Sequence, residues 1–197
     1  AEAPGWGGEL AVVAGVNRKQ SQFETDDDNR VTADLDNSGQ QTSEVLAFPL
    51  ARLDYTLPSL KTQYFLGNSR DNVAKGQIAI EFGVTHRFED QSQVTAAYFP
   101  RLPFSGETWK DPFLQDQSRE ETLERAQGGR LTLENIAGSR WTAEYAVAVN
   151  RVDDEQSGAS LVDLDAAERG LLNRDALLQR ARVELRVPLG PGLFLKP

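Results

Sequence analysis

Apolar and polar residues alternate along several stretches of this chain. Between residues 76 and 88, apolar side chains occupy every second position, at Ile78, Ile80, Phe82 and Val84. Gln77, Glu81, Thr85 and Arg87 lie on the opposite face. A period of two residues is that of a β-strand with one apolar and one polar face.

The same period marks eight segments and the beginning of a ninth. The predicted strands cover about residues 6–18, 44–57, 60–68, 76–88, 91–100, 128–136, 140–152 and 177–189, with a last piece from 192. Turn-forming residues separate these segments, and no long helical pattern lies between them. The pattern therefore predicts an all-β, antiparallel up-and-down fold.

The predicted connections alternate between long and short. The odd-numbered ones, long or of middling length, cover about residues 19–43, 69–75, 101–127 and 153–176. The even-numbered ones are tight turns at 58–59, 89–90, 137–139 and 190–191. Short turns at one end and long loops at the other are typical of bacterial outer-membrane barrels. The sequence therefore favours a transmembrane β-barrel over a soluble barrel or sandwich, which stays open as the alternative.

Aromatic residues lie near both ends of the predicted strands. Trp6, Tyr55, Phe88 and Trp141 are next to the tight turns, whereas Phe48, Tyr98 and Phe99 lie toward the long loops. Aromatic rings favour the headgroup layers of a membrane, so a spanning barrel carries two such girdles.

The two ends of the chain suggest processing and truncation. The first residues, Ala1-Glu2-Ala3, read like a mature N-terminus after removal of a signal peptide. The last residues, 193–197, begin a strand that would lack a partner in hydrocarbon. We expect residues 1–197 to be a single β-barrel domain, the N-terminal eight to nine strands of a longer barrel.

Composition narrows the possible chemistry. The chain of 197 residues has no cysteine and no methionine, which removes disulfides, thiol nucleophiles and thioether ligands. Its net charge of −9 argues against a nucleic-acid partner. No apolar run is long enough for a transmembrane helix. We expect no cofactor.

Charged residues gather on the polar side of the predicted strands. The candidates for a barrel lumen are Glu81, Arg87, Arg130, Glu134, Glu144, Arg180, Arg182, Glu184 and Arg186. In a wide barrel such rings tune ion selectivity, whereas in a narrow barrel they pair and fill the interior. Both interpretations use the same residues and stay open.

Two loop features also carry candidate chemistry. Trp109 lies in the loop of about 101–127, which either folds inward to constrict a pore or packs across the barrel mouth with Trp109 as its anchor. Asp34 and Asp36 match the opening of a calcium loop, but Val45 stands where a bidentate acid is expected. An ordinary acidic loop is therefore favoured, and no metal site is assigned.

The single histidine, His86, lies beside a predicted tight turn. A lipid hydrolase would need it beside a serine nucleophile, and Ser92 and Ser139 are the nearest candidates. Nothing in the sequence brings them together, so an interfacial structural role is favoured and no catalytic residue is assigned.

Several stretches resemble an uncharacterised family of proteobacterial outer-membrane proteins, a domain of unknown function typical of vibrios and related marine bacteria. The resemblance rests on residues 67–76 (GNSRDNVAKG), 106–113 (GETWKDPF), 134–139 (ENIAGS) and the opening 5–10 (GWGGEL). It implies an outer-membrane β-barrel and supplies no activity.

The expected function is a passive, porin-like pathway for small polar solutes in the bacterial outer membrane. The alternative is a closed barrel that displays extracellular loops for adhesion, assembly or partner binding, and a remote alternative is a lipid-modifying enzyme. The expected partners are the lipid bilayer and lipopolysaccharide. We expect no enzymatic activity.

Overall fold

The structure of the protein is a computed structural model that describes residues 3–68, 80–100, 106–190 and 193–195. Its strands are β1 (Gly5–Gln20), β2 (Gln41–Thr56), β3 (Thr62–Gly67), β4 (Glu81–Arg87), β5 (Gln93–Phe99), β6 (Glu107–Trp109), β7 (Glu121–Glu134), β8 (Trp141–Val152), β9 (Ala176–Leu185), β10 (Val187–Gly190) and β11 (Leu193–Leu195). The helical pieces are the 3₁₀ turns η1 (Asp27–Asn29) and η2 (Ile136–Gly138) and the helix α2 (Ala166–Gly170).

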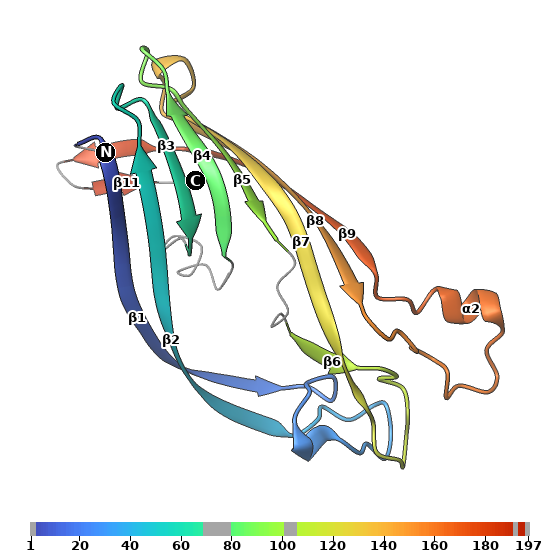
Figure 1. Cartoon of the computed structure of the whole chain (residues 1–197). Coiled ribbons are helices and arrows are strands. Elements are labelled where there is room, and N and C mark those ends of the chain that lie inside the picture. The colour runs from blue at the N-terminus through green and yellow to red at the C-terminus, as the bar shows by residue number, and fades with distance from the viewer. Residues whose placement is uncertain (1–2, 69–79, 101–105, 191–192, 196–197) are drawn as a thin grey trace.

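The strands form one curved antiparallel sheet in the order β1-β2-β3-β4-β5-β7-β8-β9, with β6 added beside β7 (Figure 1). Each strand of this path pairs with the next strand of the path along the chain, and β5 pairs with β7 because β6 lies outside the path. This confirms the predicted all-β, antiparallel up-and-down arrangement. Within the described residues, β1 and β9 are the two ends of the path.

Tight turns and long connections lie at opposite ends of the sheet (Figure 1). The turn after β2 closes through Leu60 N–H donating to the carbonyl of Leu57 at 2.9 Å, and the turn after β4 through Gln91 N–H to Phe88 at 3.2 Å. At the other end, the connection from β8 to β9 contains α2, which begins with a capping box between Asp165 and Glu168.

Several strand boundaries differ from the prediction. β7 begins at Glu121 rather than at 128, and β6 was not predicted. Polar residues dominate these extensions, so they lack the alternation that marks the other strands. β9 ends at Leu185, which pairs with Trp141, the first residue of β8, and the next residues belong to the separate pair of strands β10 and β11.

The two faces of the sheet have inverted exposure. On one face, here called the apolar face, Phe82, Leu131, Tyr145 and Val183 are 46–64% exposed. On the opposite polar face, Glu81, Thr95, Thr132 and Glu144 are at most 9% exposed. Soluble proteins bury apolar side chains and expose charged ones, so this pattern is the reverse of theirs.

Aromatic side chains pair on the apolar face near the strand ends. The rings of Trp6 and Tyr55 lie 4.9 Å apart, and those of Phe82 and Tyr98 lie 5.3 Å apart. Of the other predicted girdle residues, Phe88 and Trp141 are exposed, while the side chain of Phe48 lies outside the described parts.

Within the described residues, no helix has the length and hydrophobicity needed to cross a membrane.

Candidate functional site

A chain of ion pairs crosses the polar face from β4 to β9. The Arg130 guanidinium donates to both carboxylate oxygens of Glu81, at 3.2 and 2.7 Å. Its Nη1 lies 3.9 Å from Glu144, whose other oxygen accepts from Arg180 Nη2 at 2.6 Å. Four sequence-predicted lumen residues therefore form one connected network in the order Glu81, Arg130, Glu144 and Arg180.

Small residues allow this network to pass over β5. Ala97 lies between Gly83 of β4 and Arg130 of β7 in the register of the sheet. Because neither Ala97 nor Gly83 carries a long side chain, Arg130 can reach across two strand spacings to Glu81. Sequence reasoning placed both charges on one face but could not show that they are partners, because they are 49 residues apart.

Hydroxyl groups support the same network. Thr132 Oγ1 accepts from Arg130 Nη1 at 3.2 Å and lies 3.4 Å from Glu144. On the neighbouring strands, the hydroxyls of Thr85 and Thr95 lie 2.9 Å apart. Charged groups with this many partners hold fixed positions.

The remaining predicted lumen residues take more local partners. Gln93 donates to Glu134 at 2.6 Å, and the Nη2 of Arg182 lies 3.0 Å from Glu184. Arg87 makes a long contact of 3.5 Å with Gln93. Arg186 lies outside the ladder of β9, because that strand ends one residue earlier, and its backbone N–H donates to Arg140.

A second polar cluster on β2 was not among the sequence candidates. Arg52 Nε donates to Asp54 at 2.9 Å, and its guanidinium lies 4.2 Å from the centre of the Phe65 ring. The signal was present in the sequence, because both charges occupy alternate positions of a predicted strand.

An open cavity of about 790 Å³ lies where β1 and β2 reach the long-loop end. Its wall combines the ends of β1 and β2 with β6, β7 and the loop before η1, and its residues include Asn17, Lys19, Glu24, Asp26, Glu44 and Glu107. Lys19 pairs with Glu24 at 2.6 Å. Within the described residues, Glu44 and Glu107 take no ion pair, so the cavity carries an excess of negative charge.

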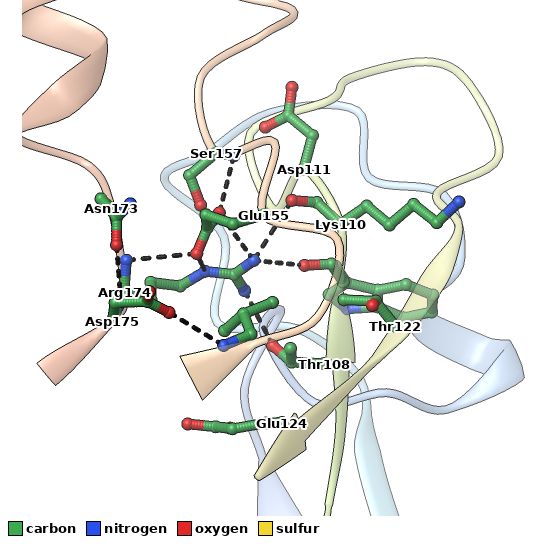
Figure 2. Close-up of polar contacts among 12 residues, drawn as sticks. Thr108, Lys110, Asp111, Thr122, Glu124, Glu155, Ser157, Asn173, Arg174 and Asp175 are labelled. Carbon is green, nitrogen blue, oxygen red and sulfur yellow. Dashed lines mark hydrogen bonds and ion pairs between the residues drawn. The ribbon is translucent and has the colours of Figure 1, made fainter. Parts of the chain in front are cut away.

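Three long connections are bound to one another at this end. We call residues 21–40, 106–120 and 153–175 the loop assembly. Arg174 is one centre of it (Figure 2): its guanidinium donates to Glu155, to the hydroxyl of Thr108 and to the carbonyls of Trp109 and Lys110. A single side chain from the last connection therefore holds the middle one.

Glu155 and Asp111 complete this junction (Figure 2). Partial burial raises the pKa of Glu155, but hydrogen bonds from Arg174 and Ser157 outweigh it and lower the pKa to about 2. The Asp111 carboxylate accepts from the backbone N–H of Gly158 at 3.0 Å and of Ser160 at 2.7 Å. Polar contacts thus fix the path of the backbone in this region.

Trp109 lies inside the loop assembly and has no exposed surface. The guanidinium of Arg119 lies 4.6 Å from the centre of its ring. The indole is therefore an apolar centre between the connections, and whether the loop constricts a pore or packs across a barrel mouth stays a prediction.

The weak calcium candidates form an ordinary polar turn. Asp34 accepts from the backbone N–H of Asp36 at 3.0 Å and from the amide of Asn37 at 3.2 Å. Among the residues that the structure describes, no group of three or more histidine, aspartate or glutamate side chains is arranged to hold a metal.

The side chain of His86 contacts a threonine and a phenylalanine. Its Nδ1 is 2.8 Å from the hydroxyl of Thr62, and its ring meets Phe88 edge-on at 4.8 Å. Ser92 instead donates to Asp90 at 2.5 Å. The hydrogen-bonding partner of His86 is therefore a threonine on the neighbouring strand.

A family model described as "Protein of unknown function (DUF2860)" matches residues 5–197. The chain belongs to this family. The match spans the whole sheet and every residue of the polar-face network. Searches of curated proteins and of solved structures find no match to the chain.

Proposed function

We propose that this DUF2860 protein is a non-enzymatic β-barrel of a bacterial outer membrane and a passive pathway for small polar solutes. The inverted exposure of the sheet carries this proposal. Its apolar face would contact lipid, and its polar face would line the lumen. Exposed apolar area of this extent in water favours association or aggregation, whereas in lipid it is the expected exterior of a barrel.

The length of the apolar face supports a membrane location. On β8, apolar side chains point to this face from Trp141 to Val149 and give way to Arg151. Nine residues of a tilted strand are about the length that spans the hydrocarbon core. We also propose that the lipid bilayer and lipopolysaccharide surround the apolar face, and that the long-loop end lies on the outside of the cell.

The cavity at the long-loop end supports a preference for cations. A solute that enters there would meet Glu44 and Glu107 before it reaches the paired charges of the wall. Carboxylates near a pore entrance raise the local concentration of cations and repel anions. The proposed substrates are therefore small polar solutes that are neutral or positively charged.

Ion conductance of the refolded protein in a planar bilayer tests this function. We expect stable conductance, with a cation preference that falls several-fold in the double variant Glu44→Gln/Glu107→Gln. Glu121→Gln is the matched control, because Glu121 is exposed and lies outside the lining of the cavity. Arg182→Glu on the polar face should increase the cation preference.

A folded barrel without conductance would refute the pathway and favour a second function. That function is display of the long loops to a partner at the cell surface. The specific observation in its favour is the loop assembly, which holds Trp109 and Arg119 buried at the end of the sheet. Loss of a surface phenotype after replacement of residues 153–175 would support it.

A further inference from the structure

Arg119 is a buried arginine without an acidic partner in the described parts of the chain. It lies in the loop assembly and is 2% exposed. Its Nη1 donates to the carbonyl of Pro112 at 3.3 Å, and its Nη2 donates to the carbonyl of Asn29. Burial lowers the pKa of this guanidinium, and no neighbouring carboxylate opposes the shift.

Two carbonyls and an aromatic ring stabilise this charge only in part. Removing a guanidinium from water is strongly unfavourable unless an opposite charge compensates it. The ring of Trp109, 4.6 Å away, contributes a cation–π interaction, which is weaker than an ion pair. Carbonyl oxygens carry only partial negative charge.

Arg119 contacts both Trp109 and Asn29, and each of these three residues has a buried donor without a hydrogen-bond partner. These donors are Arg119 Nε, the indole Nε1 of Trp109 and the side-chain amide Nδ2 of Asn29. All three residues are at most 3% exposed. Buried donors are almost always paired in folded proteins. One such donor on an uncompensated cation and one on each of two residues that it contacts indicate that an acceptor belongs there.

We propose that Arg119, Trp109 and Asn29 form a binding site for a small monovalent anion of the size of chloride. A guanidinium N–H, an indole N–H and an amide N–H supply the donors, and the guanidinium supplies the charge. Because the three residues are almost completely buried, a large anion would not reach them. Because these residues come from two connections, the bound anion would join residues 21–40 to residues 106–120.

This site is independent of the proposed transport function. It lies within the loops rather than on the polar face of the sheet, and it needs neither a lumen nor a solute gradient. A lack of ion conductance would not contradict the anion site, and a lack of anion binding would not contradict the proposed pathway.

Bromide quenching of Trp109 fluorescence tests the proposal. The chain has three tryptophans, so Trp6→Phe/Trp141→Phe leaves Trp109 as the only one. Because Trp109 has no exposed surface, collisions with bromide in solution should quench it little. We expect saturable quenching at constant ionic strength that chloride reverses. Quenching that rises linearly and ignores chloride would overturn the proposal.

Asn29→Asp in the same background supplies a carboxylate from the protein itself. The substitution keeps the oxygen that accepts from Gln40 N–H at 2.8 Å, so the local turn should be retained. We expect at least tenfold weaker bromide binding. Asn173→Asp is the control, because it adds the same charge to the loop assembly at an exposed position. Equal bromide binding in the two variants would also overturn the proposal.

Discussion

At the scale of single residues, the loop assembly depends on charges with unusually complete hydrogen bonding. Glu155 accepts from the side chain and the backbone of Arg174, and also from the backbone of Ser157. The side chains of Glu155 and Arg174 are only 13% and 26% exposed, so solvent screens this ion pair weakly. This pair should therefore contribute more to stability than the exposed ion pairs of the same loops.

Acid should loosen the loop assembly through Glu155. Its pKa of about 2 lies below the ordinary 4.5, so the unfolded loops bind this proton more tightly than the folded ones. The stabilisation, about 3 kcal/mol at full strength, is present above pH 4.5 and is lost as the pH falls toward 2. Pepsin cleavage of the loops should rise over this window.

The variant Glu155→Gln provides the comparison for this acid response. It removes the titrating group, so cleavage should be faster at pH 4.5 and should change less toward pH 2. An identical acid response in the variant and the parent protein would contradict the role of Glu155.

At the scale of elements, each strand presents different chemistry to its two sides. On β7, Leu131 and Leu133 point to the apolar face, and Thr132 between them contacts Glu144. One-residue slippage of a strand would exchange these sides, so the network on the polar face helps to fix the register.

The loss of stability on arginine substitution along the apolar face of β7 should show which part of this face contacts lipid. In phospholipid vesicles we expect Leu131→Arg to reduce the free energy of unfolding by about 2–4 kcal/mol, as at a bilayer midplane. Gln127→Arg, on the same face but nearer the long loops, should cost about 0–1 kcal/mol. Urea titration in vesicles gives both values.

A soluble sheet would respond differently to these substitutions. Leu131 and Gln127 are both exposed, and exposed substitutions in water usually change stability by less than about 0.5 kcal/mol. Equal, small effects at both positions would therefore contradict a lipid-facing surface.

At the scale of the whole molecule, the sheet has a turn end and a loop end. Tight turns of a few residues join strands at one end, and the loop assembly lies at the other (Figure 1). An outer-membrane protein with this order exposes its loops to the medium and its turns to the periplasm.

Cysteine labelling of intact cells should distinguish the two ends. The chain contains no cysteine, so each introduced thiol is unique. Val162→Cys, in the loop assembly at an 88% exposed position, should react with a membrane-impermeant maleimide. Glu89→Cys, in the turn between β4 and β5, should react only after lysis. Equal labelling of both in intact cells would contradict this orientation.

Sequence alone determined most of the strands, their order and their two faces, because alternation and turn chemistry are local properties. Residues such as Glu81, Arg130 and Glu144 could therefore be assigned to one face. β6 and the first part of β7 escaped prediction because polar residues dominate them, so that they lack a regular alternation, and because they form through pairing with their neighbours.

Only the tertiary structure decided which charges are partners and which loops touch. Glu81 and Arg130 are 49 residues apart, and Arg174 and Thr108 are 66 apart, so no local pattern links them. Arg119 is an example of the same limit: its sequence context is that of a solvated loop, yet packing against Trp109 buries it. Burial and pairing depend on how distant segments fold together, whereas the alternation along the sequence shows only which face of a strand each residue occupies.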